Sequence, residues 1–331
     1  MRLAQLLADT RRVALVGLAK NTGKTETLAA IVAEAAAAGR ALGVTSIGRD
    51  GEEHDVIDAR ISKPRVRLEA GSLVASTGPL LHASPARHER LLQTGIRTPL
   101  GEVVIARFSE PGTVEVAGPS AAADVRAVGE AMIELGAEQV LIDGAIDRRA
   151  ASSPAVADGL VMATGAVLAA DIERVVAHTS EAVDLVRLAR AGSHDGVPVP
   201  RRVVLSGDQA EISALLRERG HSSFIVAGAL SERFLEGLVR ARRERAGREL
   251  SVIAADPTKV FLSHRGPRWY ARQGVSIEVQ QTIELKAITI NPVAPRSHRF
   301  DSRQLRERIE AAVADVPVYD VLDSSYVALA K

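Results

Sequence analysis

The sequence contains no cysteine, few aromatic residues and almost no net charge. Without cysteine the chain forms no disulfide bonds, thiolate metal sites or cysteine nucleophiles, which suits a reducing cytosol. Aromatic residues make up 3% of the 331 residues, which argues against a platform of rings that stacks on single-stranded nucleic acid. The 42 basic and 41 acidic side chains leave a formal net charge of +1. We therefore expect no binding to nucleic acid or to anionic lipid through bulk electrostatics.

Long hydrophobic runs are also missing. The apolar run at 13–19 is broken by glycine and is far too short to span a bilayer. The first residues lack the apolar core and cleavage site of a signal peptide. We expect a cytoplasmic protein with no membrane segment. Its length and its 46% share of hydrophobic residues predict two domains or one large α/β domain.

The most specific motif is a glycine-rich loop between a predicted strand and a predicted helix. The aliphatic run 13–16 predicts a buried strand, and the alanine-rich segment 25–38 has helical spacing. In such a loop, backbone N–H groups and the positive end of the helix bind phosphate oxygens. Lys24 would reach the β and γ phosphates of ATP or GTP, and the Thr25 hydroxyl would hold Mg²⁺. The predicted nucleotide-binding residues are Gly17, Lys20, Asn21, Thr22, Gly23, Lys24 and Thr25.

The spacing of this loop is longer than the standard one. Five residues separate Gly17 from Gly23, where the common phosphate-binding loop has four. This longer form resembles the loop of dethiobiotin synthetase and of its relatives in the signal-recognition and MinD branch of P-loop proteins. Lys20 lies near the place where MinD-type proteins carry a signature lysine, but not at it, so we do not assign it that role.

Two carboxylates are candidates for the metal site. Asp143 ends the hydrophobic run 139–143, the arrangement of a strand-terminal aspartate that holds Mg²⁺ at the carboxyl edge of a sheet. Asp50 follows the predicted strand 41–47 and could hold Mg²⁺ or orient the attacking group, or it could belong to a solvated acidic loop. Arg148 could stabilise phosphate charge or lie on the surface. We predict Lys24, Asp143 and Asp50 as catalytic residues and Thr25, Asp50 and Asp143 as metal ligands.

Predicted strands and helices alternate along most of the chain. Strands are expected at 203–206, 223–227 and 250–255, and helices at 179–191, 209–219 and 231–245. A hairpin is expected from strands 102–108 and 113–117. The segment 191–200 has the composition of a linker, so we place a P-loop domain at 1–195 and a second α/β region at 196–331, separate from the first or continuous with it. The fold class is thus α/β, with a P-loop NTPase parallel sheet flanked by helices and a second, smaller α/β region.

Two later segments place polar side chains directly after predicted strands, where α/β proteins bind ligands. Asn291 precedes a proline, and it either reads the edge of a nucleotide base or closes an Asx turn. Asp256 either faces a ligand or caps a helix. The arginines of the predicted helix 231–245 are interspersed with glutamates and are predicted to be a solvated face.

Five segments taken together resemble one family. They are Gly17–Thr25, Gly48–Asp55, Leu141–Arg148, Asp256–Lys259 and Asn291–Pro292. As a set they resemble the small P-loop subunit of the lysine 5,6-aminomutase reactivase family. The resemblance implies an ATPase that restores an inactivated, cobalamin-dependent aminomutase by exchanging its damaged cofactor, together with a MutS-like ATPase subunit.

The residues by themselves predict a Mg²⁺-dependent nucleoside-triphosphatase, an ATPase first and a GTPase as the alternative, that acts on a protein partner. Two other classes stay open. One is a dethiobiotin synthetase-like ligase that uses ATP to activate a carboxylate or carbamate. The other is a switch that binds nucleotide without turnover. By analogy with relatives of this loop type, a homodimer is a further expectation.

Overall fold

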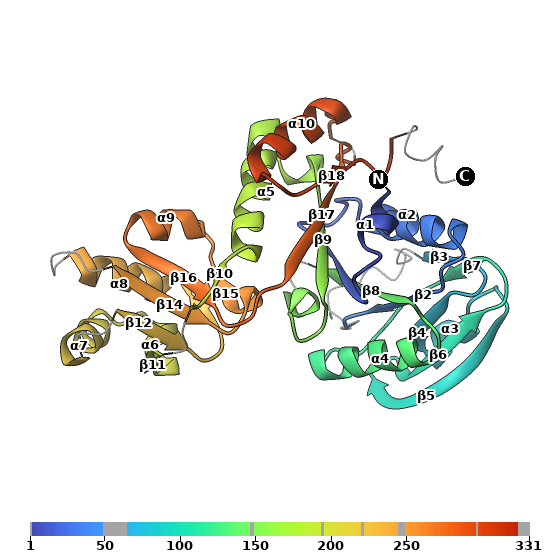
Figure 1. The fold of residues 1–331 in the computed structure, drawn as a ribbon, viewed down its shortest axis with the longest axis horizontal. Helices are drawn as coiled ribbons and strands as arrows, with labels where there is room; N and C mark the ends of the chain where they lie inside the picture. The colour runs from blue at the N-terminus through green and yellow to red at the C-terminus, as the bar shows by residue number, and fades with distance from the viewer. Residues whose placement is uncertain are drawn as a thin grey trace. The chain divides into compact units, whose positions relative to one another are not determined.

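The chain forms two compact units in the computed structural model, which describes residues 2–48, 65–145, 149–192, 195–219, 222–243, 249–295 and 297–323. Unit 1 contains Met1–Thr179 and Leu285–Lys331, and unit 2 contains Ser180–Glu284 (Figure 1). The boundary expected at 195/196 therefore lies inside unit 2, and the last segment of the chain returns to unit 1. Sequence alternation could not show this, because it does not reveal which sheet a strand joins.

Unit 1 is built on a nine-stranded sheet, with β1 flanked by β8 and β9. In order across the sheet, the strands are β18 (Val318–Tyr319), β17 (Glu284–Asn291), β9 (Gly159–Gly165), β1 (Arg12–Gly17), β8 (Gln139–Ala145), β2 (Leu42–Ser46), β4 (Leu73–Thr77), β6 (Gly101–Phe108) and β5 (His88–Thr98). The pairs β1–β8, β1–β9, β2–β8, β2–β4 and β17–β18 are parallel. β6 runs antiparallel to β4 and β5. The predicted α/β fold with a large, mostly parallel sheet is confirmed.

Helices cover both faces of this sheet. They are α1 (Leu3–Leu6), α2 (Lys24–Ala37), α3 (Gly78–His82), α4 (Ala122–Glu134), α5 (Ile172–Val186) and α10 (Ser302–Val313), with 3₁₀ turns at Arg149–Ser152 and Ala166–Leu168. Leu141 of β8 belongs to the same core cluster as Leu28 of α2, whereas the adjacent Val140 lies next to Gly129 of α4. Because successive strand residues point to opposite faces, α2 and α4 cover opposite sides of the sheet.

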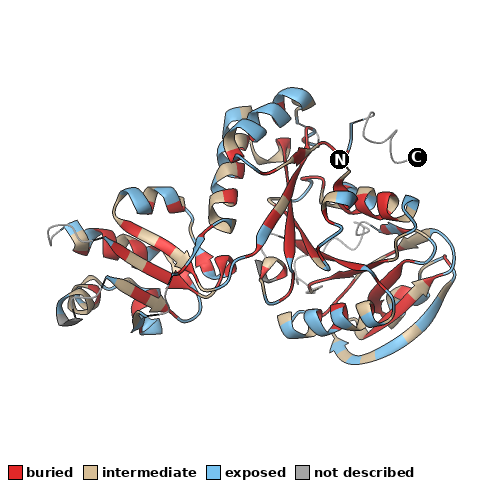
Figure 2. Ribbon diagram, viewed as in Figure 1, coloured by how far each residue is buried: buried red, intermediate tan, exposed pale blue. Residues whose placement is uncertain are grey.

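The central strands are buried on both faces, as Figure 2 shows. On the outside of the unit, α10 lies beside α5, and Arg308 of α10 contacts Glu173 of α5 (Figure 1). Among the described residues, no helix has the length and apolar composition needed to cross a membrane.

The expected hairpin of strands 102–108 and 113–117 is wrong. β7 (Gly112–Val114) pairs with β3 (Val66–Leu68) in a separate two-stranded sheet. β6 instead lies between β4 and β5 and so becomes an interior strand of the large sheet. Its apolar run gains more burial there than in an isolated hairpin, which is marginally stable in water.

Unit 2 contains a smaller parallel sheet of five strands. In order, they are β10 (Ala189–Arg190), β16 (Val275–Val279), β14 (Leu250–Ala254), β12 (Ser223–Val226) and β11 (Val197–Val199). The helices are α6 (Arg201–Ser206), α7 (Gln209–Arg219), α8 (Glu232–Arg243) and α9 (Pro267–Arg272), with a 3₁₀ turn at Pro257–Lys259. β13 (Leu230–Ser231) pairs with β15 (Val260–Phe261). Phe224, Phe234 and Tyr270 are fully buried in the core of this unit.

Three local predictions in this part of the chain are corrected. The apolar run 203–206 is helix α6, because a short apolar run fits one helical face as well as a strand. The linker-like segment contains strand β11. The helix predicted at 179–191 begins earlier, since the carboxylate of Asp171 accepts hydrogen bonds from the N–H groups of Glu173 and Arg174 at the start of α5.

Candidate functional site

The glycine-rich loop connects the carboxyl end of β1 to the first residue of α2. Two of its residues have positive φ angles, 65° at Asn21 and 88° at Gly23. Glycine adopts this left-handed conformation without penalty, and asparagine tolerates it better than most residues. The loop therefore folds back tightly against the start of the helix.

This conformation leaves a run of backbone donors without acceptors. Within the described part of the chain, the N–H groups of Thr22, Gly23, Lys24 and Thr25 donate to no protein oxygen, and the first helical hydrogen bond runs from Thr27 N to Gly23 O at 2.9 Å. Successive N–H groups in a turn of this kind form a concave anion site, and the positive end of the helix dipole adds to it. The loop thus has the geometry of a phosphate cradle.

Lys24 and Asp143 meet at the same edge of the sheet. The ammonium of Lys24 lies 2.9 Å from Oδ1 of Asp143 and donates to the carbonyl oxygen of Gly144 at 2.7 Å. Strand pairing explains the contact, because β8 lies directly beside β1 and Asp143 pairs with Leu15. The two side chains are 23% and 30% exposed, so solvent and ligands can reach both.

The other loop residues differ in role. Thr22 is buried and its hydroxyl donates to Ala19 O at 3.0 Å, which makes it a brace inside the loop. Lys20 is exposed and contributes no described contact to the site. Thr25 is half-buried on the first turn of α2, one residue after Lys24. Its hydroxyl and the carboxylate of Asp143 are both hard oxygen donors, the kind that Mg²⁺ prefers.

A third strand reaches the loop from the other side. The Nδ2 of Asn291, at the end of β17, donates to Asn21 O at 3.0 Å, and Oδ1 accepts from the N–H of Val293 at 3.0 Å, as in an Asx turn. Sequence reasoning did not single out Thr289, which contacts Thr27 of α2 at 2.7 Å between hydroxyl oxygens. Its position two residues before Asn291 was the available signal, because such residues share a face of a strand.

The remaining predicted residues lie either outside the described part of the chain or in unit 2. Asp50 and Arg148 lie outside the described residues, as does the acid-rich turn beyond Gly48. Asp256 belongs to unit 2, where it accepts from Thr258 N at 2.8 Å and caps the 3₁₀ turn. In the described part of the chain, no three His, Asp or Glu side chains come together as a metal-binding group.

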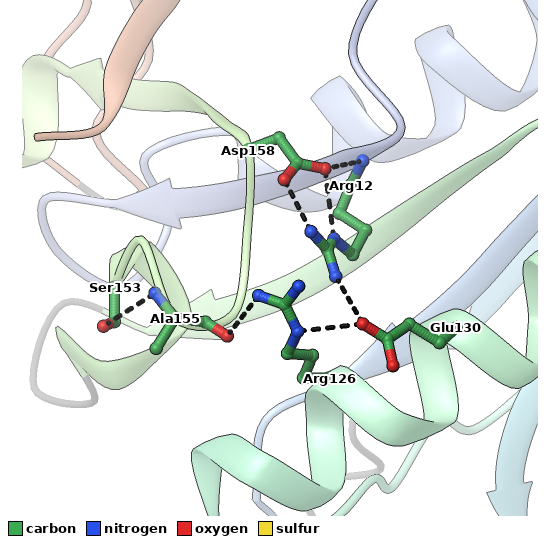
Figure 3. Close-up of polar contacts among 6 residues, drawn as sticks. All are labelled: Arg12, Arg126, Glu130, Ser153, Ala155 and Asp158. Atoms are coloured by element: carbon green, nitrogen blue, oxygen red, sulfur yellow. Dashed lines mark hydrogen bonds and ion pairs between the residues drawn. The ribbon is translucent and has the colours of Figure 1, made fainter.

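The opposite end of β1 carries a different ion pair. The guanidinium of Arg12 binds both oxygens of Asp158, at 2.6 and 3.0 Å, and also Glu130, at 3.2 Å (Figure 3). Arg126 joins Glu130 to the carbonyl of Ala155. The hydrogen bond to Asp158 raises the pKa of Arg12 above its ordinary value, although burial acts in the opposite direction. These charges are paired with one another at the amino edge of the sheet. The network therefore stabilises the fold and is not part of the candidate site.

The candidate site is therefore formed by the ends of β1, β8 and β17 together with the start of α2. Comparison with protein-family models, curated proteins and solved structures finds no match to this chain. The geometry of this site is therefore the basis for proposing a function.

Proposed function

We propose that unit 1 is a P-loop nucleotide-binding unit that binds a Mg²⁺-nucleoside triphosphate and hydrolyses it. The observation that carries this proposal is the run of N–H groups at 22–25, which has no acceptor among the described residues and begins a helix beside the Lys24 ammonium. A run of donors that no described carboxylate accepts favours a polyanion such as triphosphate.

Each group has a distinct task in this proposal. The N–H groups of the loop bind phosphate oxygens, and Lys24 neutralises the β and γ phosphates. The ammonium exchanges its contact with Asp143 for the phosphates, which releases that carboxylate. Thr25 and Asp143 would hold Mg²⁺, whose remaining ligands come from phosphate oxygens and water, as is usual for this ion. The metal supplies charge neutralisation at the transferring phosphoryl group.

Catalysis of this kind needs positioning and charge stabilisation rather than a covalent intermediate. The change in charge and contacts after hydrolysis would be passed to a partner protein. The resemblance described above supports a cobalamin-dependent aminomutase as that partner, with reactivation as the process and a MutS-like ATPase as the second subunit. The absence of cysteine supports a cytoplasmic setting.

The test is calorimetric titration of ATP and GTP, each with Mg²⁺, into wild-type protein and Lys24→Ala. The matched control is Lys286→Ala, because Lys286 also pairs with an aspartate, Asp9, at 3.4 Å, but at the start of β17. We expect micromolar binding of one or both triphosphates, a loss of at least a hundredfold in Lys24→Ala and no change in the control.

Binding that survives in Lys24→Ala would contradict the site, and wild-type protein that binds neither triphosphate would contradict the function.

Measurements of hydrolysis separate the three proposed classes of protein. Turnover that a protein partner stimulates supports the reactivase, and turnover only with a small carboxylate or carbamate supports a ligase. Binding without turnover under either condition identifies a switch.

A further inference from the structure

The chain contains two asparagines, and the structure joins them by a hydrogen bond. Both ends of the Asn291 amide are engaged, since Oδ1 accepts from Val293 N–H and Nδ2 donates to Asn21 O. Rotating this amide by half a turn would place oxygen against the Asn21 carbonyl and NH₂ against an N–H donor. The contacts therefore fix the orientation of the side chain, and its donor group faces the loop.

A second chain of hydrogen bonds runs in parallel with the first. The Thr27 hydroxyl donates to Gly23 O at 2.9 Å, so its single proton is used. Thr289, 2.7 Å away, must then be the donor to Thr27. Thr27 and Thr289 are each 1% exposed, and Asn291 is 9% exposed. β17 thus reaches two carbonyl groups of the loop through buried side chains: Asn291 contacts Asn21 O directly, and Thr289 reaches Gly23 O through Thr27.

These contacts have a direct effect on the loop donors. In a trans peptide, the carbonyl oxygen and the following N–H point in opposite directions. Holding Asn21 O toward Asn291 therefore turns the N–H of Thr22 away from β17. Holding Gly23 O toward Thr27 likewise turns the N–H of Lys24 away from Thr27. Both N–H groups belong to the run that has no acceptor among the described residues.

Close packing leaves the end of β17 little room to shift. A Cβ at Gly165 of β9 would lie 2.2 Å from Asn291 O, so glycine is what allows this approach. A Cβ at Gly23 would lie 3.1 Å from the Asn291 Cβ. The end of β17 is consequently in close contact with β9 on one side and with the loop on the other.

We infer that Thr289 and Asn291 form a clamp that holds the loop in its phosphate-binding conformation, a role that rests on the proposed function. Asn291 is then a positioning residue, which acts through the Asn21 carbonyl and not by reading a nucleotide base. Its effect on affinity is the same whichever base is attached, and it extends to a polyphosphate with no base at all.

The experiment compares Asn291→Ala with wild-type protein in calorimetric titrations of ATP, GTP and inorganic tripolyphosphate, each with Mg²⁺. We expect all three affinities to fall by one common factor of about ten, the value of one or two lost hydrogen bonds. Thr289→Val should weaken the three ligands by a smaller common factor of about three. Lys286→Ala, at the other end of the same strand, should leave all three unchanged.

Loss of base discrimination with unchanged tripolyphosphate binding would overturn the clamp in favour of base reading. Unchanged affinities in both variants would overturn it as well. If Asn291→Ala fails to fold, as shown by its thermal unfolding curve, Thr289→Val decides the matter alone. Wild-type protein that binds none of the three ligands refutes the proposed function, and the clamp with it. Normal wild-type binding with any other pattern refutes the clamp alone.

Discussion

Two runs of consecutive backbone N–H groups, one in each unit, differ in their protein acceptors. In unit 2 the N–H groups of 263–265 all donate to the carboxylate of Glu232, at distances between 2.7 and 3.1 Å. The ring of His264 and the hydroxyl of Tyr270 also contact this carboxylate, at 3.1 and 3.2 Å. In unit 1 no described carboxylate accepts from the N–H groups of 22–25, and the Lys24 ammonium lies beside them.

In unit 2 the run stabilises the fold, whereas in unit 1 we propose that it binds a ligand. Burial raises the pKa of Glu232. The N–H groups of Ser263, His264 and Arg265 together lower it by a larger amount, so the pKa lies below its ordinary value. The chain itself thus supplies the anion in unit 2. In unit 1 the described residues supply donors and a cation, and we propose that the anion comes from outside the chain.

The largest predicted effect comes from altering the run in unit 1. Gly23→Ala places a side chain at a φ of 88°, and the new Cβ meets Asn291 at 3.1 Å. The backbone strain and the contact together cost about 3 kcal/mol, so triphosphate affinity should fall on the order of a hundredfold. Calorimetric titration of Mg²⁺-ATP measures this fall.

The matched control is Gly39→Ala, at a φ of 71° after helix α2, where a new Cβ meets no atom within 4 Å. It should lower the free energy of unfolding by about 1 kcal/mol and leave triphosphate affinity unchanged. Equal losses of affinity in the two variants would show that general strain, and not the cradle, explains the effect.

A smaller effect is expected from Glu232→Gln, which removes the charge that the run in unit 2 binds. Its loss should lower the free energy of unfolding of unit 2 by about 2 kcal/mol at neutral pH. Because the folded-state pKa of Glu232 is lowered, its contribution is present above the ordinary pKa of glutamate. The contribution disappears as the pH falls through the folded-state value.

Denaturant unfolding from pH 7 to pH 3 measures this dependence. Wild-type protein should lose stability toward acid, and Glu232→Gln should lose less over the same range. Both proteins keep the neighbouring His264, so the difference between their two curves isolates the contribution of Glu232. Parallel curves for the two proteins would contradict the assignment of the acid-dependent stability to Glu232.

The smallest effect is expected at the amino edge of the sheet in unit 1. Arg12→Gln breaks the contacts to Asp158 and Glu130, whose side chains are 38% and 50% exposed. It should lower the free energy of unfolding by about 1 kcal/mol and leave triphosphate affinity unchanged. A loss of affinity in the folded variant would show that this ion pair, too, belongs to the binding site.

Much of the site was predictable because short-range sequence patterns encode it. The strand, glycine loop and helix at 13–38 are local, and Asp143 follows from a hydrophobic run that ends in an acid. Their juxtaposition then follows from parallel pairing, which brings the carboxyl ends of β1 and β8 to one edge.

The remainder depends on contacts between distant parts of the chain. Nothing near Asn291 indicates that β17 joins the sheet of unit 1 after the chain has passed through unit 2. The role of Thr289 follows only from that placement, since its partner Thr27 lies 262 residues away in sequence. The false hairpin has the same origin, because β6 finds both of its partners outside the segment that resembles a turn.

Amide hydrogen–deuterium exchange with and without Mg²⁺-ATP tests the central comparison most directly. We predict fast exchange at residues 22–25 without nucleotide and strong slowing when it is added, because the phosphates then accept those N–H groups. Residues 263–265 should exchange slowly in both conditions, since Glu232 already accepts theirs. Exchange at 22–25 that saturating Mg²⁺-ATP leaves unchanged would contradict the account.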